Sequence, residues 1–219
     1  MNRYPWTTTL RPFSMKKIVV LLSLAALATS AVADEVAVMQ IQSGEKIQRV
    51  VIEFYEEAAP LTVANFKKLA SKRFYNGTAF HRVFPLQMIQ GGDPLSKNKN
   101  ATGIGTGGPG YTLPAEIGRK HLAGTVAAAR LPDKINPARV SNGSQFYITL
   151  TPMPQLDGQY TVFGHVIEGL DALNAISKLR TDTNDSPLER VVIQGVHIVS
   201  RETAQTGGNW FQRVYYRHF

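Results

Sequence analysis

The sequence predicts a mainly β domain, an antiparallel barrel or sandwich that carries two helices. Three observations support this prediction. Short strand-like stretches recur along the chain, turn residues separate them, and helical periodicity appears in two segments. Many short strands with turn signals between them are typical of antiparallel barrels and sandwiches. Two helices are too few for a fold that alternates parallel strands with crossover helices.

The first two strands are predicted to form a hairpin. Residues 35–42 (EVAVMQIQ) alternate between two faces, and Ser43-Gly44 supplies a turn. Residues 47–56 (IQRVVIEFYE) follow as the second strand. Two such runs joined by a short turn indicate an antiparallel pair.

A helix is predicted for residues 59–77, after this hairpin. Pro60 suits the first helical turn, and Asn76-Gly77 ends the segment. Because its apolar residues recur at helical spacing, we expect this helix to cap the sheet. These residues are Val63, Phe66, Leu69 and Ala70.

The rest of the chain supplies six further strand candidates and one more helix. Residues 169–179 form the helix candidate, since leucine and isoleucine recur there at helical spacing. The strand candidates are short, and turn residues separate them. They are residues 78–84, 87–90, 124–129, 144–151, 161–167 and 189–199.

The N-terminal region contains a predicted secretory signal peptide, residues 15–33. Lys16 and Lys17 form its basic start, residues 18–31 are mostly apolar, and Ala31-Val32-Ala33 is an A-x-A cleavage site. A core helix or an uncleaved anchor is the alternative. Residues 1–14 are interpreted as an over-called translation start, with a genuine extension as the alternative.

Cleavage after Ala33 would leave 186 residues, a length that suits one domain with a substantial core. The full chain has a net charge of +8, but four basic residues precede the cleavage site, so residues 34–219 carry 20 basic and 16 acidic side chains. Because the basic residues are scattered, we expect no nucleic-acid partner. The mature chain is also expected to have no stable membrane span.

The chain contains no cysteine, so an exported form would have no disulfides. A domain of this size does not need them. Cysteine-free chains are common in the bacterial envelope, and together with the signal peptide this predicts a periplasmic location.

The sequence shows no persuasive cofactor or metal motif. GIGTGG at residues 103–108 matches G-x-G-x-x-G as a string, but Pro109 follows it and no helix does, so the dinucleotide fingerprint is incomplete. A mobile loop that lines a groove is the preferred interpretation. The histidines have no metal-ligand spacing, and structural roles are expected for His121, His165 and His197.

Two long motifs carry a family resemblance. Residues 80–93 (FHRVFPLQMIQGGD) and residues 141–164 (SNGSQFYITLTPMPQLDGQYTVFG) resemble the signature segments of the cyclophilins, which are peptidyl-prolyl cis-trans isomerases. GTGGPGY and GTVAAAR lie between them in the matching order, and the likeness covers roughly residues 36–200. It implies an eight-stranded antiparallel barrel closed by two helices, with an isomerase domain at 34–200 and a tail at 201–219.

The resemblance also implies the substrate and the chemistry. The substrates would be Xaa-Pro bonds in peptides and unfolded polypeptides, and the family needs no metal, cofactor or covalent nucleophile. Rotation about the peptide bond has a barrier of about 18–20 kcal/mol. Twisting localises a lone pair on the prolyl nitrogen, and a fixed cation nearby stabilises that state. Arg82 matches the catalytic arginine of the family.

Binding roles are implied for ten further residues. Phe80, Met88 and Leu156 match the floor of the proline pocket. Gln90 and Gln145 match the residues that hold the substrate backbone and position the arginine. Ala129 and Arg130 match a strand edge that pairs with the peptide, His81 matches a groove histidine, and Tyr147 and Tyr160 stand at pocket positions.

Four positions and one loop depart from the family pattern. Gln87 and Tyr147 replace phenylalanines of the pocket, and Tyr160 replaces a histidine. Gln155 replaces a tryptophan that contacts cyclosporin, which predicts weak inhibition by that drug. The segment at residues 130–144 is longer than the shortest family version and is expected to alter one rim of the groove.

The function predicted from these features is a periplasmic prolyl isomerase that assists the folding of exported proteins. The first alternative is a cyclophilin-like binding module or chaperone with weak turnover, which Gln87 favours because it makes the pocket less apolar. A nucleotide-binding protein that uses GIGTGG is the second. We expect a monomer. The aromatic tail at residues 201–219, which includes Trp210, is expected to dock on the barrel or on an envelope partner.

Overall fold

The computed structural model describes residues 34–206. The chain divides into two units, residues 1–33 and residues 34–219, and every described residue belongs to the second. The predicted extension (1–14) and signal peptide (15–33) therefore lie outside the described residues, as does the part of the tail that contains Trp210.

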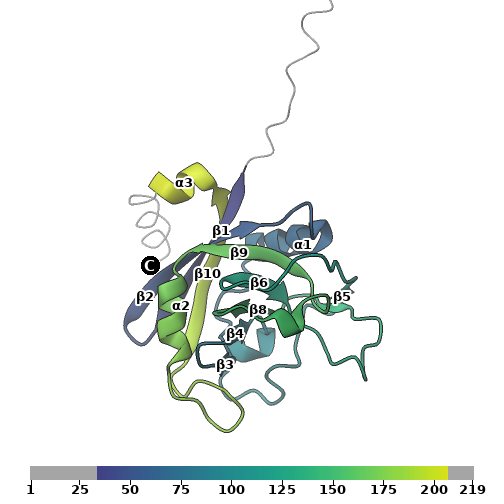
Figure 1. Ribbon diagram of the computed structural model, residues 1–219. Coiled ribbons are helices and arrows are strands. Elements are labelled where there is room, and N and C mark those ends of the chain that lie inside the picture. The colour runs from purple at the N-terminus through teal and green to yellow at the C-terminus, as the bar shows by residue number, and fades with distance from the viewer. Residues whose placement is uncertain (1–33, 207–219) are drawn as a thin grey trace, which may run out of the picture. The chain divides into compact units, whose positions relative to one another are not determined.

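An eight-stranded antiparallel sheet forms the body of the domain (Figure 1). Its strand order is β10-β1-β2-β9-β6-β8-β4-β3. Each of the eight predicted strands overlaps one of these strands, so the predicted fold class is confirmed. The strands are β1 (Glu35–Ser43), β2 (Lys46–Phe54), β3 (Arg82–Phe84), β4 (Met88–Gly91), β6 (Thr125–Ala128), β8 (Phe146–Thr149), β9 (Val162–Glu168) and β10 (Val191–Ser200).

The remaining elements are short. A two-stranded sheet, β5 (Thr112–Leu113) and β7 (Ser141–Asn142), was not predicted because two residues are too few to show a pattern. The α-helices are α1 (Pro60–Ser71), α2 (Leu170–Ser177) and α3 (Arg201–Thr206), and the 3₁₀ helices are η2 (Pro94–Lys97) and η3 (Pro154–Leu156). No helix in the described range is both long enough and apolar enough to cross a bilayer.

The sheet curls until its two outer strands are joined. Residues 77–80, which lead into β3, bond to β10: Gly77 N donates to Ile193 O at 2.8 Å and Phe80 N donates to Val191 O at 3.0 Å. The predicted strand at residues 78–84 is therefore two pieces, one paired with β10 and one, β3, paired with β4. This pairing satisfies backbone groups that an open edge would expose.

Aromatic packing under α1 fills the curled sheet. The Phe66 ring lies 4.9 Å from that of Tyr75, 5.4 Å from that of Phe163 and 5.8 Å from that of Phe146. The second helix, α2, buries Leu173 and Ile176 in the same core. Burial of each such side chain contributes about 1.5–3 kcal/mol, so the two predicted helices hold the sheet in its curled form.

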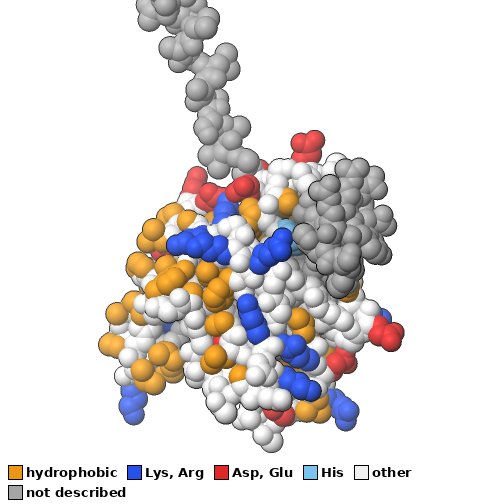
Figure 2. All heavy atoms as spheres, turned by 180° about the vertical axis from the view of Figure 1, so that it is seen from behind, with side chains coloured by type: hydrophobic (Ala, Val, Ile, Leu, Met, Phe, Trp, Pro, Cys, Tyr) orange, Lys and Arg blue, Asp and Glu red, His pale blue; other side chains and the backbone are white. Residues whose placement is uncertain are grey.

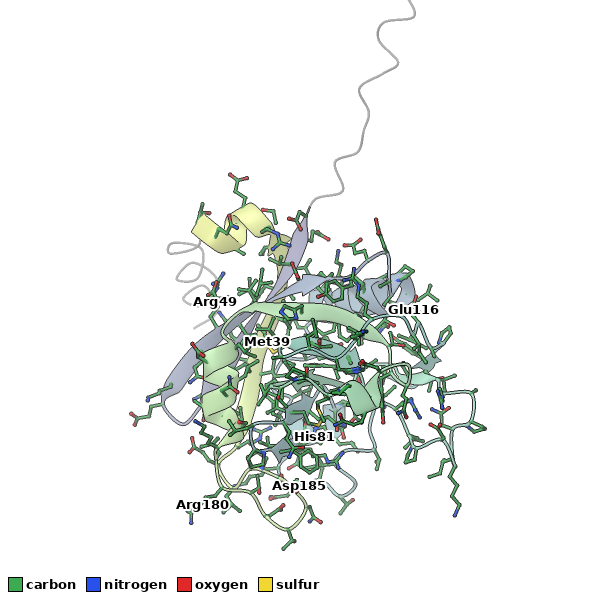
Figure 3. The ribbon with its side chains drawn as sticks, in the orientation of Figure 1. Met39, Arg49, His81, Glu116, Arg180 and Asp185 are labelled. Carbon is green, nitrogen blue, oxygen red and sulfur yellow. The ribbon has the colours of Figure 1, made fainter. Side chains whose placement is uncertain are left out.

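Both ends of α1 depend on signals that its own sequence does not show. The helix ends at Ser71, not at the predicted Asn76-Gly77, because Arg73 adopts a left-handed φ of 55°. Phe74 N donates to Leu69 O at 3.0 Å, which completes a Schellman turn without the usual glycine. At the other end, Glu116 of a distant loop accepts from the Thr62 backbone N–H at 2.9 Å and so caps the helix (Figure 3).

The first six residues of the predicted tail form α3. Ala204 is buried with Val36, Val38 and Val51 on the outer face of β1 and β2. Its carbonyl accepts a hydrogen bond from Arg49 Nη2 at 2.7 Å. Residues 201–206 therefore pack on the sheet.

Charged side chains on the rear face of the molecule lie in separate places (Figure 2). Lys and Arg side chains are spread over that face and do not form one continuous patch.

Candidate active site

A cleft of about 370 Å³ opens on the outer face of β3, β4 and β8. Most of its apolar lining comes from Met88, Tyr147 and residues 153–160. Its volume falls within the range of small-ligand pockets, which is about 300–1,000 Å³. The lining residues are Arg82, Phe84, Gln87, Met88, Gln90, Gly105, Ala129, Arg130, Tyr147, Met153, Leu156 and Tyr160.

Strand register explains why these side chains meet. Arg82 is paired with Gln90 across β3 and β4, and Gln90 is paired with Tyr147 across β4 and β8. Residues directly opposite each other in a sheet project from the same face. The intervening residues Val83 and Ile89 point the other way and are fully buried in the core.

Phe80 does not lie in this cleft, so its predicted role in the pocket floor is wrong. Its side chain is buried in the core, with its ring edge-on to Phe146 at 6.2 Å. A Cβ at Gly91 would lie 3.0 Å from the Phe80 ring, which shows how closely the backbone passes. Because β3 begins only at Arg82, the alternation that would put Phe80 on the same face as Arg82 does not extend back to it.

His81 lies behind the cleft and does not line it. Gly105 covers it, since a Cβ at Gly105 would lie 3.8 Å from the imidazole ring. Both ring nitrogens are buried and have no hydrogen-bond partner among residues 34–206. Burial lowers the pKa of His81, so the neutral ring is favoured.

Arg82 stands at the rim of the cleft with 48% of its side chain exposed. Its Cζ lies 4.5 Å from the centre of the Phe84 ring, a cation–π contact. Its Nε is 3.9 Å from Asp185 Oδ2, and the Asp185 carbonyl accepts from Val83 N at 2.8 Å. The guanidinium is thus held from one side and open on the other.

Gln90 and Gln145 form a hydrogen-bond network of their own. Gln90 Nε2 donates to Gln145 Oε1 at 3.0 Å, and Gln145 Nε2 donates to the carbonyls of Gly105 at 3.0 Å and Gly107 at 2.7 Å. Neither glutamine hydrogen-bonds Arg82 in the part of the chain that the structure describes. The two glutamines therefore hold the glycine-rich loop in place. The structure does not show the predicted contact by which they would position Arg82.

The GIGTGG segment is a bonded wall of the cleft. The buried Asp93 carboxylate accepts from the backbone N–H of Gly105 and, at 3.2 Å, from that of Gly107. A Cβ at Gly107 would lie 2.1 Å from Asp93 Oδ1, so only glycine fits there. The loop lines the groove as predicted, but these bonds and the Gln145 contacts argue against the predicted mobility.

A second cleft, of about 490 Å³, adjoins the first and shares Gln90, Gly105, Ala129 and Arg130 with it. The longer segment at residues 130–144 forms its outer wall. Leu131 and Ile135 are exposed there, at 56% and 69%. The predicted alteration of one rim is therefore an added apolar wall.

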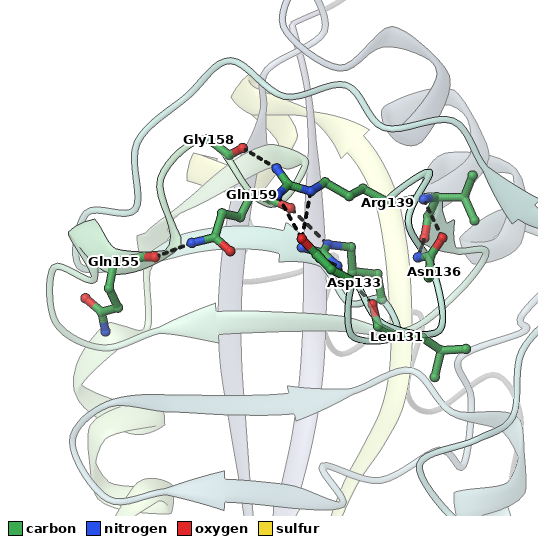
Figure 4. Close-up of polar contacts among 9 residues, drawn as sticks. Leu131, Asp133, Asn136, Arg139, Gln155, Gly158 and Gln159 are labelled. Carbon is green, nitrogen blue, oxygen red and sulfur yellow. Dashed lines mark hydrogen bonds and ion pairs between the residues drawn. The ribbon is translucent and has the colours of Figure 1, made fainter.

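Arg130 is buried, with only 3% of its side chain exposed. Its Cζ lies 4.5 Å from the centre of the Tyr160 ring, and its Nε donates to Gln159 O at 2.9 Å. Asp133 bridges Arg130 and Arg139, whose Nη2 donates to Asp133 Oδ2 at 2.8 Å (Figure 4). Hydrogen bonds from Arg130 and Arg139 lower the pKa of Asp133, so it stays ionised.

Of the two residues predicted to pair with the peptide backbone, Ala129 and Arg130, only Arg130 has backbone groups available for it within residues 34–206. The Ala129 N–H donates to Gln145 O at 3.0 Å and its carbonyl accepts from Asn142 N at 2.8 Å. Both groups are therefore used within the fold. Among the described residues, the backbone N–H and carbonyl of Arg130 make no backbone hydrogen bond.

Two lining residues were missed by sequence reasoning. Phe84 lies two residues after Arg82 on the same strand, so period-two alternation could have identified it. Met153 precedes η3, in a segment that only the fold brings to the cleft. Gln155, by contrast, is exposed and does not line the cleft. No group of three or more His, Cys, Asp or Glu side chains within residues 34–206 could hold a metal ion.

The family model of the cyclophilin-type peptidyl-prolyl cis-trans isomerases matches residues 38–198. The chain belongs to that family. It is accordingly a peptidyl-prolyl isomerase, and the catalysed reaction is exchange between the cis and trans forms of Xaa-Pro bonds.

Curated relatives and solved structures agree. Peptidyl-prolyl cis-trans isomerase B of Bacillus subtilis is 40% identical over 158 residues, which cover 71% of this chain and 95% of that protein. The peptidyl-prolyl cis-trans isomerase of Synechococcus elongatus is 41% identical over 145 residues, 66% of this chain and 88% of that protein. A cyclophilin-type isomerase of Cryptosporidium parvum, crystallised with the dipeptide Ala-Pro, superposes with a TM-score of 0.65 at 29% identity, over 76% of this chain and 99% of that one.

These relatives come from several kingdoms. The matches include fungal, mammalian and bacterial proteins. Family membership therefore establishes the reaction without indicating a bacterial periplasmic protein.

Proposed function

We propose that this isomerase works in the 370 Å³ cleft, with Arg82 as its catalytic residue. The observation that carries the proposal is the placement of a half-exposed guanidinium at the rim of a pocket that is lined in part by Met88, Tyr147 and Leu156. A prolyl ring seated against Met88, Tyr147 and Leu156 would leave its nitrogen facing the rim. A cation there stabilises the lone pair that appears when the amide twists, and does less for the planar ground state.

The rest of the substrate would lie along the neighbouring groove. Within residues 34–206 the backbone N–H and carbonyl of Arg130 make no backbone hydrogen bond, which leaves both for a peptide, and Gln90 lines the same cleft. Residues on one side of the proline would then enter the 490 Å³ cleft, against Leu131 and Ile135. Proline-containing peptides and unfolded chains, being extended, suit such a groove.

Folding of exported proteins in the periplasm is the proposed biological role. The predicted signal peptide at residues 15–33 supports it, together with the absence of cysteine. N-terminal sequencing of exported protein tests it, because a mature chain should begin at Asp34. A chain that begins at Met15 would contradict both the cleavage and the compartment.

A protease-coupled assay on an Ala-Pro peptide tests the site, with Arg180→Ala as matched control. Arg180 is an exposed arginine, and no hydrogen bond or ion pair of its side chain is seen among the described residues. We expect turnover well above background in the wild type and the control, and a large loss in Arg82→Ala. Near-background turnover with retained peptide binding in the wild type would favour the alternative of a binding module or chaperone, which Gln87 in the cleft lining supports.

A further inference from the structure

The Tyr147 hydroxyl is bound to a buried histidine behind the pocket wall. Tyr147 itself lines the cleft, yet only 4% of the residue is exposed. Its hydroxyl lies 2.9 Å from His121 Nε2, and the two ring planes are within 6° of parallel. The hydroxyl that distinguishes this tyrosine from a phenylalanine is therefore directed away from the cleft.

Asp157 fixes the tautomer of His121. Its Oδ1 lies 3.0 Å from His121 Nδ1 and also accepts the His121 backbone N–H at 2.7 Å. These two contacts, the backbone one first, lower the pKa of Asp157, so the carboxylate is ionised and can only accept. Nδ1 therefore carries a proton, and in the neutral ring Nε2 is then bare and accepts from the Tyr147 hydroxyl.

Burial of the Tyr147 and His121 side chains is consistent with a hydrogen bond donated by the Tyr147 hydroxyl to His121. The His121 side chain is fully buried, and burial raises the pKa of the Tyr147 hydroxyl, so that hydroxyl keeps its proton. A buried hydroxyl without a partner is destabilising, and His121 removes that cost.

His121 also joins the two walls of the pocket. Its carbonyl accepts from Met153 N at 2.9 Å, so its backbone and ring together hold residues 153 and 157. That segment carries Met153 and Leu156, which line the cleft opposite β8. The Tyr160 ring contacts His121 edge-on, with the centroids 6.3 Å apart.

We propose that His121 and Asp157 are positioning residues for the isomerase: they turn the Tyr147 hydroxyl away from the pocket and hold its ring as an apolar wall for the prolyl group. Neither residue touches the cleft. The proposal rests on the assignment of this cleft as the prolyl pocket. It gives His121 a role in substrate binding and not in the core alone.

A double-mutant cycle tests the proposal, with Tyr147→Phe, His121→Leu and both together, measured as kcat and KM on an Ala-Pro peptide. We expect His121→Leu to lower kcat/KM about five- to tenfold, mainly through KM, as loss of a buried hydrogen bond does. Because the double variant has no unpaired tyrosine hydroxyl, His121→Leu should cost clearly less in the Tyr147→Phe background. Equal losses in the two backgrounds, or a lowered melting temperature with unchanged kcat/KM, would overturn the proposal.

Two further measurements keep the proposal testable if His121→Leu does not fold. Asp157→Asn retains a carbonyl that can accept from Nδ1–H, so its KM should stay close to that of the wild type. His121→Gln serves as the comparison, because it removes the imidazole. If Asp157→Asn raises KM as far as His121→Gln does, the proposed hydrogen bonds from Asp157 through His121 to Tyr147 are contradicted. The ¹⁵N shifts of His121 in the wild-type protein should show a neutral ring protonated at Nδ1. A ring protonated at Nε2 would overturn the proposal even with full turnover, whereas absent wild-type turnover would count against the pocket itself.

Discussion

Two arginines line the same cleft and each makes a cation–π contact, yet one side chain is exposed and the other is buried. Each guanidinium lies 4.5 Å from the centre of an aromatic ring, Arg82 over Phe84 and Arg130 over Tyr160. Arg82 is 48% exposed and Arg130 is 3% exposed. Arg130 uses its Nε and Nη1 within the protein, on Asp133 and two backbone carbonyls, whereas Arg82 has one distant carboxylate.

This difference separates a catalytic role, which we propose for Arg82, from a structural role, which we assign to Arg130. A guanidinium whose donors are already bound cannot respond to charge that develops on a substrate. One that is oriented by a ring and otherwise open can do so without breaking a bond. The sequence assigns both residues to the site, and only their surroundings distinguish the two roles.

The largest effect is expected for Arg82→Ala. Loss of one preorganised donor costs about 2.7–4 kcal/mol, or roughly 10²–10³ in kcat/KM. Thermal stability should barely change, because half of the side chain is in water. Arg82→Lys should remain poor, since a point charge does not replace a planar fork. Peptide assays beside melting curves check this, and near-normal turnover in folded Arg82→Ala would refute the mechanism.

Arg130→Ala should show the reverse pattern. Removal of a charged group that makes several hydrogen bonds costs about 1.5–3 kcal/mol of folding stability. Tyr160 and the segment at residues 130–140 then lose a common support, so we expect a clearly lower melting temperature and a loss of kcat/KM smaller than that of Arg82→Ala. If Arg130→Ala instead abolishes turnover without changing its unfolding curve, Arg130 acts on substrate directly.

Acid should weaken the two sides of the cleft in different pH ranges. Burial lowers the pKa of His81 beside Arg82, so the unfolded chain binds the proton more readily and stability falls once the pH drops below the ordinary value of 6.5. The Asp133 pKa is lowered by Arg130 and Arg139, so its contribution is present in full above the ordinary value of 3.8 and is lost as the pH falls from there through the folded-state value.

Urea unfolding at a series of pH values checks this order, with His81→Gln as the variant. That substitution should remove part of the loss below pH 6.5 and cost far less activity than Arg82→Ala. A wild-type stability that is flat between pH 7 and the acid range near 4 would show that His81 is not the group that titrates there.

How far the sequence predicts this molecule depends on the range of each interaction. The eight strands follow from short strand-like stretches that turn residues separate, and alternation along β4 then puts Met88 and Gln90 at the cleft. The role of Phe80 was carried over from the family resemblance, whereas in the structure its segment pairs with β10 and its ring lies in the core. The end of α1 was missed because an arginine, not a glycine, adopts the left-handed conformation at position 73.

The surroundings of Arg82 illustrate what sequence cannot supply. Asp185 lies about a hundred positions away in a loop after α2, and it reaches β3 through a backbone bond to Val83 and the ion pair with Arg82. The partner of Tyr147 is hidden likewise, since a lone histidine in a loop has no local pattern. Such contacts depend on the folded arrangement of segments, each of which looks ordinary by itself.

The smallest effect is expected for Asp185→Asn. Asparagine keeps the backbone bond to Val83 and tolerates the left-handed φ of 61° at this position, so the substitution removes only the charge. Since the ion pair is exposed and 3.9 Å long, it should contribute about 0–1 kcal/mol and be screened by salt. We expect kcat/KM to change by less than about threefold and the melting temperature to stay within error. Steady-state kinetics at low and high salt check this, with Asp182→Asn as the control in the same loop. A tenfold loss confined to Asp185→Asn would mean that the carboxylate, and not the Phe84 ring, holds the catalytic guanidinium, and the contrast between an open Arg82 and an anchored Arg130 would then have to be abandoned.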